Sequence, residues 1–334
     1  MTCYNYDYSP LQRRPFHIMT NDNATLDDLR GEIDEIDDAI HALVMRRAAM
    51  AERIAAAKDD TARNDGRAAA GYLRPGREAA VLRRLVACHS GSFPLPSLVH
   101  LWREIMSSLV RLQGPFSVAV YTVADNPGYW DLARDHYGST TPLIACQSAI
   151  QVLREVTEGR ATVGVLPFPQ EGDAAPWWPF IGNARNNEPK VIARLPFLVA
   201  NQATGGATRG QVSAVAVASL TPEETGDDRS LLTLELVEEL SRARLVSALA
   251  SVGLAPLWQT TGPSHGGQGG LYLIETAGFV AQDDARLAKL AEMLGNALNR
   301  VTILGAYPSP ILIPGGTAAE ESNRRLAAAG SLRL

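Results

Sequence analysis

The side chains in this sequence that are best placed to bind a ligand are basic residues, which lie at intervals along one long stretch. The stretch 25–58 contains no proline, and its apolar residues recur at alternating steps of three and four. That period predicts one side of a helix packed against other helices. At position 47 the step is occupied by Arg47 instead of an aliphatic residue. A charge at a buried position is costly unless it is paired, so a bound anion would suit Arg47.

Two further cations extend this hypothesis. Lys58 follows Arg47 by eleven residues, and Arg30 precedes it by seventeen. On a helix, Lys58 is turned by about 20° and displaced by about 16 Å from Arg47, so both long side chains could close on one small anion. Arg30 is turned by about 100° and lies about 25 Å away. Arg30 could therefore serve the equivalent site of a symmetry-related chain.

Three helices between 25 and 114 are expected to position these cations. Thr25, with Asp28 three residues later, is a good N-cap for the first helix. That helix would be roughly 50 Å long, more than so short a segment can cover, so a partner chain is expected. Prolines favour the start of a second helix at 77–89 and of a third that ends at 113, before Gly114 and Pro115.

The composition bounds the class of protein. The chain has 334 residues, 46% hydrophobic content and a net charge of −5, which predicts two or three globular domains and no nucleic-acid partner. Cys3, Cys88 and Cys146 are too few and too scattered for a disulfide framework or a zinc site, and we expect no metal or cofactor. We read no secretion signal and no membrane span, so a cytoplasmic protein without a membrane partner is expected.

The pattern changes after the third helix. From 115 to 222, predicted strands alternate with helices, which indicates an α/β region with a mostly parallel sheet. From 223 to 313, predicted strands at 230–236, 270–275 and 301–306 and helices at 238–252 and 283–298 indicate a smaller α+β domain with an antiparallel sheet. Residues 1–24 are expected to form a mobile leader, and 314–334 a mobile tail.

The helical region resembles a known family. Taken singly, its basic residues could be solvated surface, Glu78 a first-turn acid and Gln113 an exposed helix end. Taken together, the positions of Arg30, Asp37, Arg47, Lys58, Arg77, Glu78 and Gln113 resemble the all-helical, intertwined-dimer chorismate mutases. The closest likeness is to the mutase domain that begins bifunctional chorismate mutase–prephenate dehydratases. The strings Tyr-Leu-Arg-Pro-Gly-Arg-Glu at 72–78 and Trp-Arg-Glu-Ile-Met-Ser-Ser at 102–108 agree with it.

The resemblance implies that arginines hold the substrate. Arg47 and Arg77 would bind the two carboxylates of chorismate, and Arg30 would be contributed by the second subunit of a homodimer. Because chorismate is a dianion, guanidinium groups suit its carboxylates. The reaction to prephenate is unimolecular and needs no nucleophile. Holding the enolpyruvyl side chain over the ring would therefore supply the proximity that accelerates it.

The resemblance also implies the polar contacts of the reacting atoms. Lys58 and Gln113 would hydrogen-bond the ether oxygen, where charge develops in the transition state, and Glu78 would meet the ring hydroxyl. Leu109 stands where many relatives have a serine, a change expected to affect binding more than chemistry.

The remainder resembles prephenate dehydratase with altered motifs. Residues 163–167 are similar to the dehydratase strand that leads into Asn-Ser-Thr-Glu-Gly, but only Gln-Glu-Gly remains at 170–172. The family's Gly-Pro-Glu-Gly-Thr loop falls at 122–128 with a different sequence, and its Thr-Arg-Phe motif reads Ser-Ala-Val at 213–215. The linker 199–213 is too short for a second lobe. We therefore expect one dehydratase-like lobe over 115–222, without dehydratase activity.

The last part resembles a regulatory ACT domain over 223–313. Residues 304–308 are similar to the end of that domain, whereas 239–245 and 259–263 depart from its Asn-Pro-Gly-Ala-Leu and Glu-Ser-Arg-Pro motifs. We expect a scaffold that does not bind phenylalanine.

The function expected from the whole sequence is a chorismate mutase of phenylalanine and tyrosine biosynthesis, in the shikimate pathway. One alternative is an isochorismate pyruvate lyase, which shares the fold and a similar site. Lys58, Glu78 and Gln113 together favour the mutase over the lyase. The other alternative is a non-catalytic regulatory subunit of a shikimate-pathway enzyme, against which the intact set of site residues argues.

Overall fold

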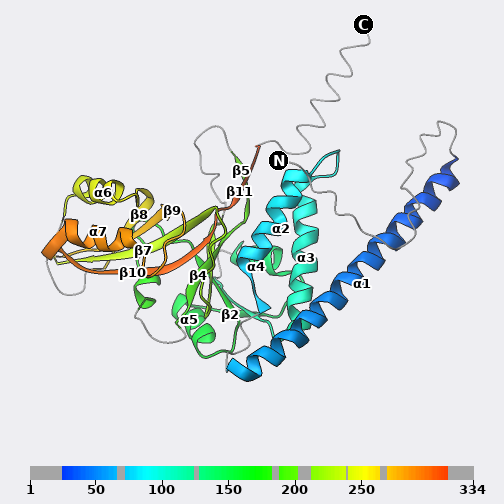
Figure 1. Cartoon of the computed structure of the whole chain (residues 1–334), viewed down its shortest axis with the longest axis horizontal. Helices are drawn as coiled ribbons and strands as arrows, with labels where there is room; N and C mark the ends of the chain where they lie inside the picture. Colours follow the sequence, from blue (N-terminus) through cyan, green and yellow to red (C-terminus); the bar gives the residue numbers. More distant parts are fainter. Residues whose placement is uncertain are drawn as a thin grey trace, which may run out of the picture.

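The computed structural model describes residues 25–65, 72–123, 128–182, 188–201, 212–237, 240–263 and 269–314. The expected leader at 1–24 and all but the first residue of the expected tail lie outside these ranges. The chain begins with α1 (Leu26–Asp65), α2 (Pro75–Cys88) and α3 (Leu95–Gln113), as the sequence predicts. A sheet with four more helices follows, on the other side of α2 and α3 from α1 (Figure 1).

Helix α1 begins with a reciprocal cap. The backbone N–H of Asp28 donates to Thr25 Oγ1 across 3.2 Å, and the N–H of Thr25 donates to Asp28 Oδ2 across 2.9 Å. Two donors that the helix cannot satisfy are paired in this way, which confirms the predicted N-cap. The helix runs 40 residues, beyond the predicted end at 58, and is about 60 Å long.

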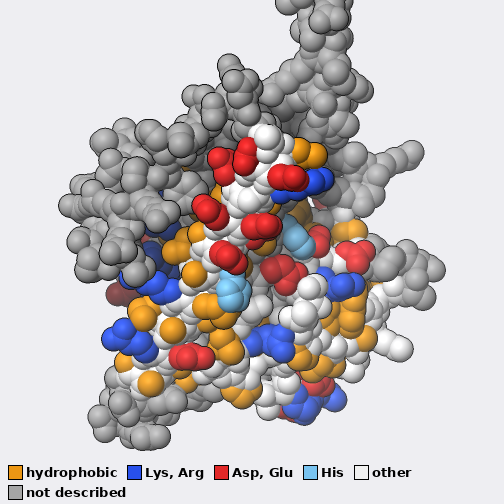
Figure 2. Space-filling view, turned by 90° about the vertical axis from the view of Figure 1, so that its right-hand side faces the viewer, with side chains coloured by type: hydrophobic (Ala, Val, Ile, Leu, Met, Phe, Trp, Pro, Cys, Tyr) orange, Lys and Arg blue, Asp and Glu red, His pale blue; other side chains and the backbone are white. Residues whose placement is uncertain are grey.

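The apolar side of α1 is open in this chain. Among its described side chains only Ala51 and Ala55 are buried. Its large apolar residues are exposed, with 56% of Ile33 and 52% of Ile40 accessible. Figure 2 views this side of the molecule and shows hydrophobic side chains lying on the surface between acidic and basic ones. Within the single chain, the predicted packing of this side against other helices is therefore made only around Ala51 and Ala55.

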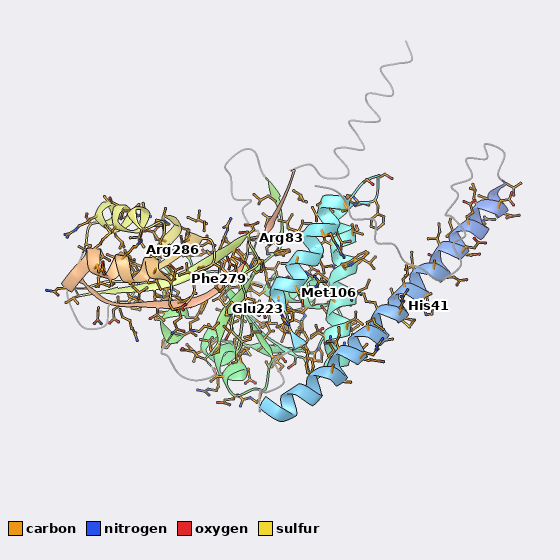
Figure 3. The ribbon with its side chains drawn as sticks, in the orientation of Figure 1. His41, Arg83, Met106, Glu223, Phe279 and Arg286 are labelled. Atoms are coloured by element: carbon orange, nitrogen blue, oxygen red, sulfur yellow. The ribbon has the colours of Figure 1, made fainter. Side chains whose placement is uncertain are left out.

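Helices α2 and α3 pack against the rest of the chain through arginines. Arg83 of α2 donates from Nη2 to the backbone oxygens of Asp227 and Ser309, across 2.6 and 3.1 Å. Figure 3 shows Arg83 on the side of α2 nearer the sheet. Arg111 of α3 donates to the backbone oxygen of Thr140 across 2.7 Å. The helical segment therefore does not stand apart from the sheet.

The first part of the sheet has the alternating order that the sequence predicts. Strands β1 (Val118–Tyr121), β2 (Leu143–Cys146) and β3 (Val163–Pro167) are parallel, and helices α4 (Gly128–Tyr137) and α5 (Ala149–Thr157) connect them. The predicted mostly parallel sheet is only partly right, because β6 (Ala214–Ala218) runs antiparallel to both β3 and β4 (Lys190–Leu195). Between β3 and β4 lies a short 3-10 helix, η2 (Trp178–Phe180).

The strand predicted at 191–199 is in fact two strands. It divides at Pro196 into β4 and β5 (Leu198–Asn201), and β5 pairs in parallel with β11 (Ile311–Pro314) in a separate two-stranded sheet. Proline has no backbone N–H to donate to a neighbouring strand, which explains why the chain leaves the main sheet at this position.

The second part has the order β7 (Asp228–Leu236), α6 (Arg242–Ser251), β8 (Pro256–Gly262), β9 (Leu271–Ala277), α7 (Ala285–Leu294), η3 (Gly295–Ala297) and β10 (Leu298–Pro308). Its four strands are antiparallel in the order β10-β7-β9-β8, as the sequence predicts for an α+β region. Both helices cover one face, where their leucines pack with those of β7. Strand β8 was not predicted, because its polar residues hide the alternation of a strand.

The two parts share one sheet, whereas the sequence predicted a separate sheet for each. Strand β10 pairs with β4 through Gly305 and Val191, giving nine strands in the order β2-β1-β3-β6-β4-β10-β7-β9-β8. Gly305 has a φ of +154°, and a Cβ there would lie 2.1 Å from the Val191 carbonyl oxygen. Only glycine allows so close an approach of the two backbones.

A buried carboxylate strengthens this junction. Glu275 on β9 is 2% exposed and accepts from Arg194 of β4 across 2.9 Å and from Arg229 of β7 across 3.4 Å. The Tyr307 hydroxyl of β10 also donates to it. Arg194 lies over the ring of Phe168, 3.8 Å from its centroid. The carboxylate thus has partners from both parts of the sheet, as a buried charge requires.

Candidate functional site

A cavity of about 540 Å³ lies between α1, α2 and α3. Among the described residues, its lining includes four arginines, Arg47, Arg74, Arg77 and Arg84, and one acid, Glu78. Its apolar lining comes from all three helices and includes Met50, Ile54, Val81, Trp102, Met106, Leu109 and Val110. A lining with more cations than acids, together with many apolar side chains, suits an anion that has a hydrocarbon body.

Helical spacing explains why these side chains meet. On α2 the lining residues fall at 77, 78, 81 and 84, just after the N-cap residue Arg74, and on α3 they fall at 102, 106, 109, 110 and 113. Residues three and four positions apart lie on one face of a helix, so each helix presents one face to the cavity. Met106 of α3 (Figure 3) lines the cavity and belongs to the same buried cluster as Ala79 and Leu82 of α2.

Arg47 lines this cavity, but the side of α1 on which it lies is not buried in the single chain as the sequence predicted. Its side chain is exposed in the single chain, as are the apolar residues Leu43 and Met50 on either side of it. Partial burial lowers the pKa of the Arg47 guanidinium, an effect that nearby Glu78 opposes and nearby Arg77 increases. The guanidinium remains a cation close to both residues.

Glu78 is held by a residue to which the sequence analysis gave no role. Arg103 of α3 is 4% exposed and donates from Nη1 to Glu78 Oε2 across 2.9 Å. Burial raises the pKa of Glu78, and the charge and hydrogen bond of Arg103 oppose that rise, with a smaller contribution from Arg47. The sequence did contain a signal, because Arg103 lies at helical spacing between the apolar residues Val99 and Met106.

The remaining predicted site residues have different outcomes. Gln113 lines the cavity beside Leu109, and its Nε2 donates to the Leu109 carbonyl oxygen across 2.9 Å. Arg30 does not line it and pairs with Asp27 across 3.0 Å near the start of α1. Lys58 belongs to α1, but its side chain lies outside the described residues. The structure therefore brings together Arg47, Arg77, Glu78 and Gln113 out of the six predicted residues.

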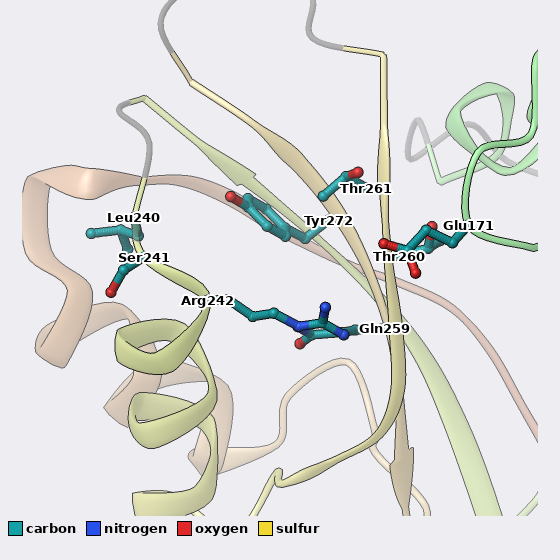
Figure 4. A pocket seen from close by; sticks show the side chains of 8 residues that line it. All are labelled: Glu171, Leu240, Ser241, Arg242, Gln259, Thr260, Thr261 and Tyr272. Carbon is teal, nitrogen blue, oxygen red and sulfur yellow. The ribbon is translucent and has the colours of Figure 1, made fainter.

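A second cavity of about 390 Å³ lies where α6 begins (Figure 4). Most of its lining comes from the two segments that depart from the ACT-like motifs: Leu240, Ser241 and Arg242 from one, and Gln259, Thr260 and Thr261 from the other. Glu171, from the altered turn at 170–172, and Tyr272 of β9 also line it. Arg242 extends across the opening toward Gln259 (Figure 4). A long cation thus occupies the place for which small residues were expected. The loss of phenylalanine binding stays a prediction.

Two of the three altered motifs, those at 170–172 and 213–215, lie just after β3 and at the start of β6, two strands that lie side by side. Phe168, just after β3, donates from its backbone N–H to the Ser213 carbonyl oxygen across 2.9 Å. Two residues later, Gln170 donates its N–H to Asp173 Oδ2 across 2.9 Å in a turn. Residues 124–127 of the third altered motif lie outside the described residues. The loss of dehydratase activity stays a prediction.

In the described ranges, no group of three or more His, Cys, Asp or Glu is arranged to hold a metal ion. No helix among the described residues is long and apolar enough to cross a membrane.

Comparison with known proteins supports the resemblance of the helices. Residues 29–114 match the family chorismate mutase type II. The bifunctional chorismate mutase/prephenate dehydratase of Pseudomonas aeruginosa is 33% identical over 157 residues, which are 46% of this chain and 41% of that protein. The match therefore spans about two fifths of the relative's length. The predicted likeness to the mutases that begin such bifunctional proteins is confirmed.

Solved structures are similar at a lower level. The structure titled "GqqA- a novel type of quorum quenching acylases" has a TM-score of 0.42 and 16% identity, and covers 57% of this chain and 94% of that one. The prephenate dehydratase of Arthrobacter aurescens in complex with L-Phe has a TM-score of 0.43 and 13% identity, and covers 65% and 100%. Similarities this low do not indicate a function.

Proposed function

We propose that this chain is a chorismate mutase, which converts chorismate into prephenate in the biosynthesis of aromatic amino acids. The observation that carries the proposal is the cavity between α1, α2 and α3, where Arg47 and Arg77 lie beside Glu78 and Gln113. The family match over 29–114 covers the same three helices. The mutase domain would correspond to residues 25–114.

The side chains of the cavity suit the rearrangement. Arg47 and Arg77 would each bind one carboxylate of chorismate and so hold its enolpyruvyl side chain above the ring. Binding would thereby keep the substrate in the conformation from which the rearrangement proceeds. Gln113 and Lys58 would donate hydrogen bonds to the ether oxygen as the C–O bond breaks. Glu78, held by Arg103, would accept from the ring hydroxyl. No cofactor takes part in this scheme.

The same proposal includes a homodimer. Arg30 lies on α1 about 25 Å from Arg47 and cannot reach the cavity of its own chain. The exposed apolar residues along the first half of α1, Leu29, Ile33, Ile36, Ile40 and Leu43, would be buried against a second copy. An antiparallel partner helix would bring its own Arg30 to the cavity. The dimer would therefore complete both sites.

The remainder is proposed to act as a scaffold. Residues 115–222 would be a dehydratase-like lobe that no longer dehydrates prephenate, and 223–313 an ACT-like domain without its amino-acid site. The order β7-α6-β8-β9-α7-β10, with both helices on one face, supports the second assignment. Arg83 and Arg111 tie this remainder to the mutase helices.

The proposal is tested by giving the purified full chain chorismate and isochorismate in separate reactions. A mutase forms prephenate from chorismate and releases no pyruvate, and we expect this result. Pyruvate from isochorismate, measured with lactate dehydrogenase, would instead show the pyruvate lyase. Failure to convert either compound would leave the non-catalytic regulatory subunit as the better description.

A further inference from the structure

A third cavity, of about 400 Å³, lies on the other side of α3 from α1. We call it the α3–α4 cavity, because its walls are α3, α4 and the turn between β4 and β5. Most of its lining is apolar: Pro96, Val99, Leu132, Pro196, Phe197 and Leu198. Its polar lining is Ser97, His100, Arg103, Asp135 and His136. Its size and its few polar groups are typical of a small-molecule site.

Arg103 has donors to spare in this cavity. Of its three nitrogens, Nη1 donates to Glu78, and neither Nε nor Nη2 donates to any residue that the structure describes. The guanidinium lies over the ring of Phe197, 5.2 Å from the centroid, and the residue is buried. A buried guanidinium with two nitrogens not used in hydrogen bonds to described residues is a place for an acceptor, and carboxylates match its forked geometry.

His136 is a second buried polar group of this cavity, and its ring makes no hydrogen bond to a described residue. It lies on α4 and makes an edge contact with the ring of Tyr137. Burial and the charge of Arg103 hold the pKa of His136 well below its ordinary value. The neutral ring therefore offers one donor and one acceptor beside the guanidinium.

The charges around the cavity restrict the ligand further. Asp135 is exposed and lies on the same lining as Arg103, and Glu78 already takes one of the guanidinium's donors. A ligand with two or more negative charges would be repelled by these two carboxylates. The exposed His100 lies 3.9 Å from Glu104 and does not change this balance. A single carboxylate on an apolar body fits best.

We propose that the α3–α4 cavity binds a small monocarboxylate, with its charge on Arg103 and its apolar body between Phe197 and Leu132. This site is separate from the proposed mutase cavity, but Arg103 connects the two. Arg103 itself lines the α3–α4 cavity, and its partner Glu78 lines the proposed mutase cavity. A carboxylate bound to Arg103 would therefore change the electrostatic environment of Glu78. The proposal does not depend on the catalytic one, because binding is measured without turnover.

This proposal is tested by calorimetry, which measures the binding of small ligands to the full-length chain. The ligand is 3-phenylpropanoate, and 3-phenylpropan-1-ol serves as the uncharged control of the same shape. We expect the carboxylate to bind and the alcohol to bind at least about tenfold more weakly, because it cannot form charge-assisted bonds to Arg103. Leu132→Trp fills the cavity without removing a charge and should abolish binding. The double variant Arg103→Met with Glu78→Gln removes the guanidinium without leaving an unpaired carboxylate. It should bind 3-phenylpropanoate about as weakly as the wild-type chain binds the alcohol.

Two variants exclude the other cavities. Arg47→Ala with Arg77→Ala, and separately Arg242→Ala, should leave the affinity for 3-phenylpropanoate unchanged. Equal affinity for the acid and the alcohol, no heat of binding at millimolar ligand, or loss of binding in either of these two variants would overturn the proposal. A mutase assay that fails would leave these results unaffected, so the two proposals can fail separately.

Discussion

Arg103 on α3 donates to the carboxylate of Glu78 on α2 across 2.9 Å, and the same guanidinium lies over Phe197, just after β4. Glu78 is the one acid among the described residues that line the cavity between α1, α2 and α3. The residue that holds it therefore contacts both α2 and the segment after β4. The α/β region thus has a physical connection to the proposed site, even where its own motifs are altered.

We predict that Arg103→Met moves the acidic limb of the activity profile to higher pH. Burial already raises the pKa of Glu78, and Arg103 opposes that rise. If ionised Glu78 is needed, activity falls as the pH drops through its pKa, and removing Arg103 raises that pKa further. The measurement is kcat/KM for chorismate against pH. Arg103→Lys, which keeps the charge, should move the limb less, and identical profiles in all three proteins would contradict the role given to Arg103.

We predict that Arg47→Ala lowers kcat/KM by several orders of magnitude, because it removes a carboxylate clamp from the cavity. Arg53→Ala is the matched control, since Arg53 is an exposed arginine of the same helix that does not line the cavity. The control should keep wild-type kinetics. Equal activity of the two variants would mean that Arg47 has no contact with the substrate.

We predict that two inactive variants restore activity when mixed. In a heterodimer of Arg30→Ala and Arg47→Ala chains, one of the two sites has both arginines. After complete subunit exchange, an equal mixture should reach about a quarter of the wild-type activity. Exchange is followed separately, with differently tagged chains. Proven exchange without recovered activity would place both arginines in one chain's site.

We predict that prephenate is released and not dehydrated, and that phenylalanine does not inhibit. The physical reason is the altered polar residues at 170–172 and 213–215, together with Arg242 in the cavity of Figure 4. The measurements are phenylpyruvate formation from prephenate at neutral pH and calorimetry with phenylalanine. Enzymatic phenylpyruvate that disappears in Ser213→Ala would refute the first part, and measurable phenylalanine binding would refute the second.

Patterns of short range were sufficient for most elements. The cap at Thr25, the three helices and the alternation after 115 depend on neighbouring residues, which the sequence displays directly. The position of Arg47 among apolar neighbours pointed to the cavity for the same reason. Arg103 has the same signature on α3, and applying one rule to both helices would have found it.

Contacts between distant segments could not be predicted in this way. The pairing of Gly305 with Val191 joins strands far apart in sequence, and nothing near either residue indicates the other. The partner of β5 after Pro196 is β11, which comes more than a hundred residues later, and nothing near β5 indicates it. The exposed side of α1 is a further example, because the sequence does not show whether the partner of an apolar helix side lies in the same chain. The sequence predicts that its apolar residues pack against other helices, whereas in one chain most of the large ones are exposed.

The most direct test of the central claim is to follow chorismate in the presence of the purified full-length chain and identify the product by nuclear magnetic resonance. The double variant Arg47→Ala with Glu78→Gln serves as the matched blank. We predict saturable loss of chorismate with prephenate as the product, and a rate in the blank close to the uncatalysed one. A wild-type rate that equals the blank, or a product other than prephenate, would contradict the account.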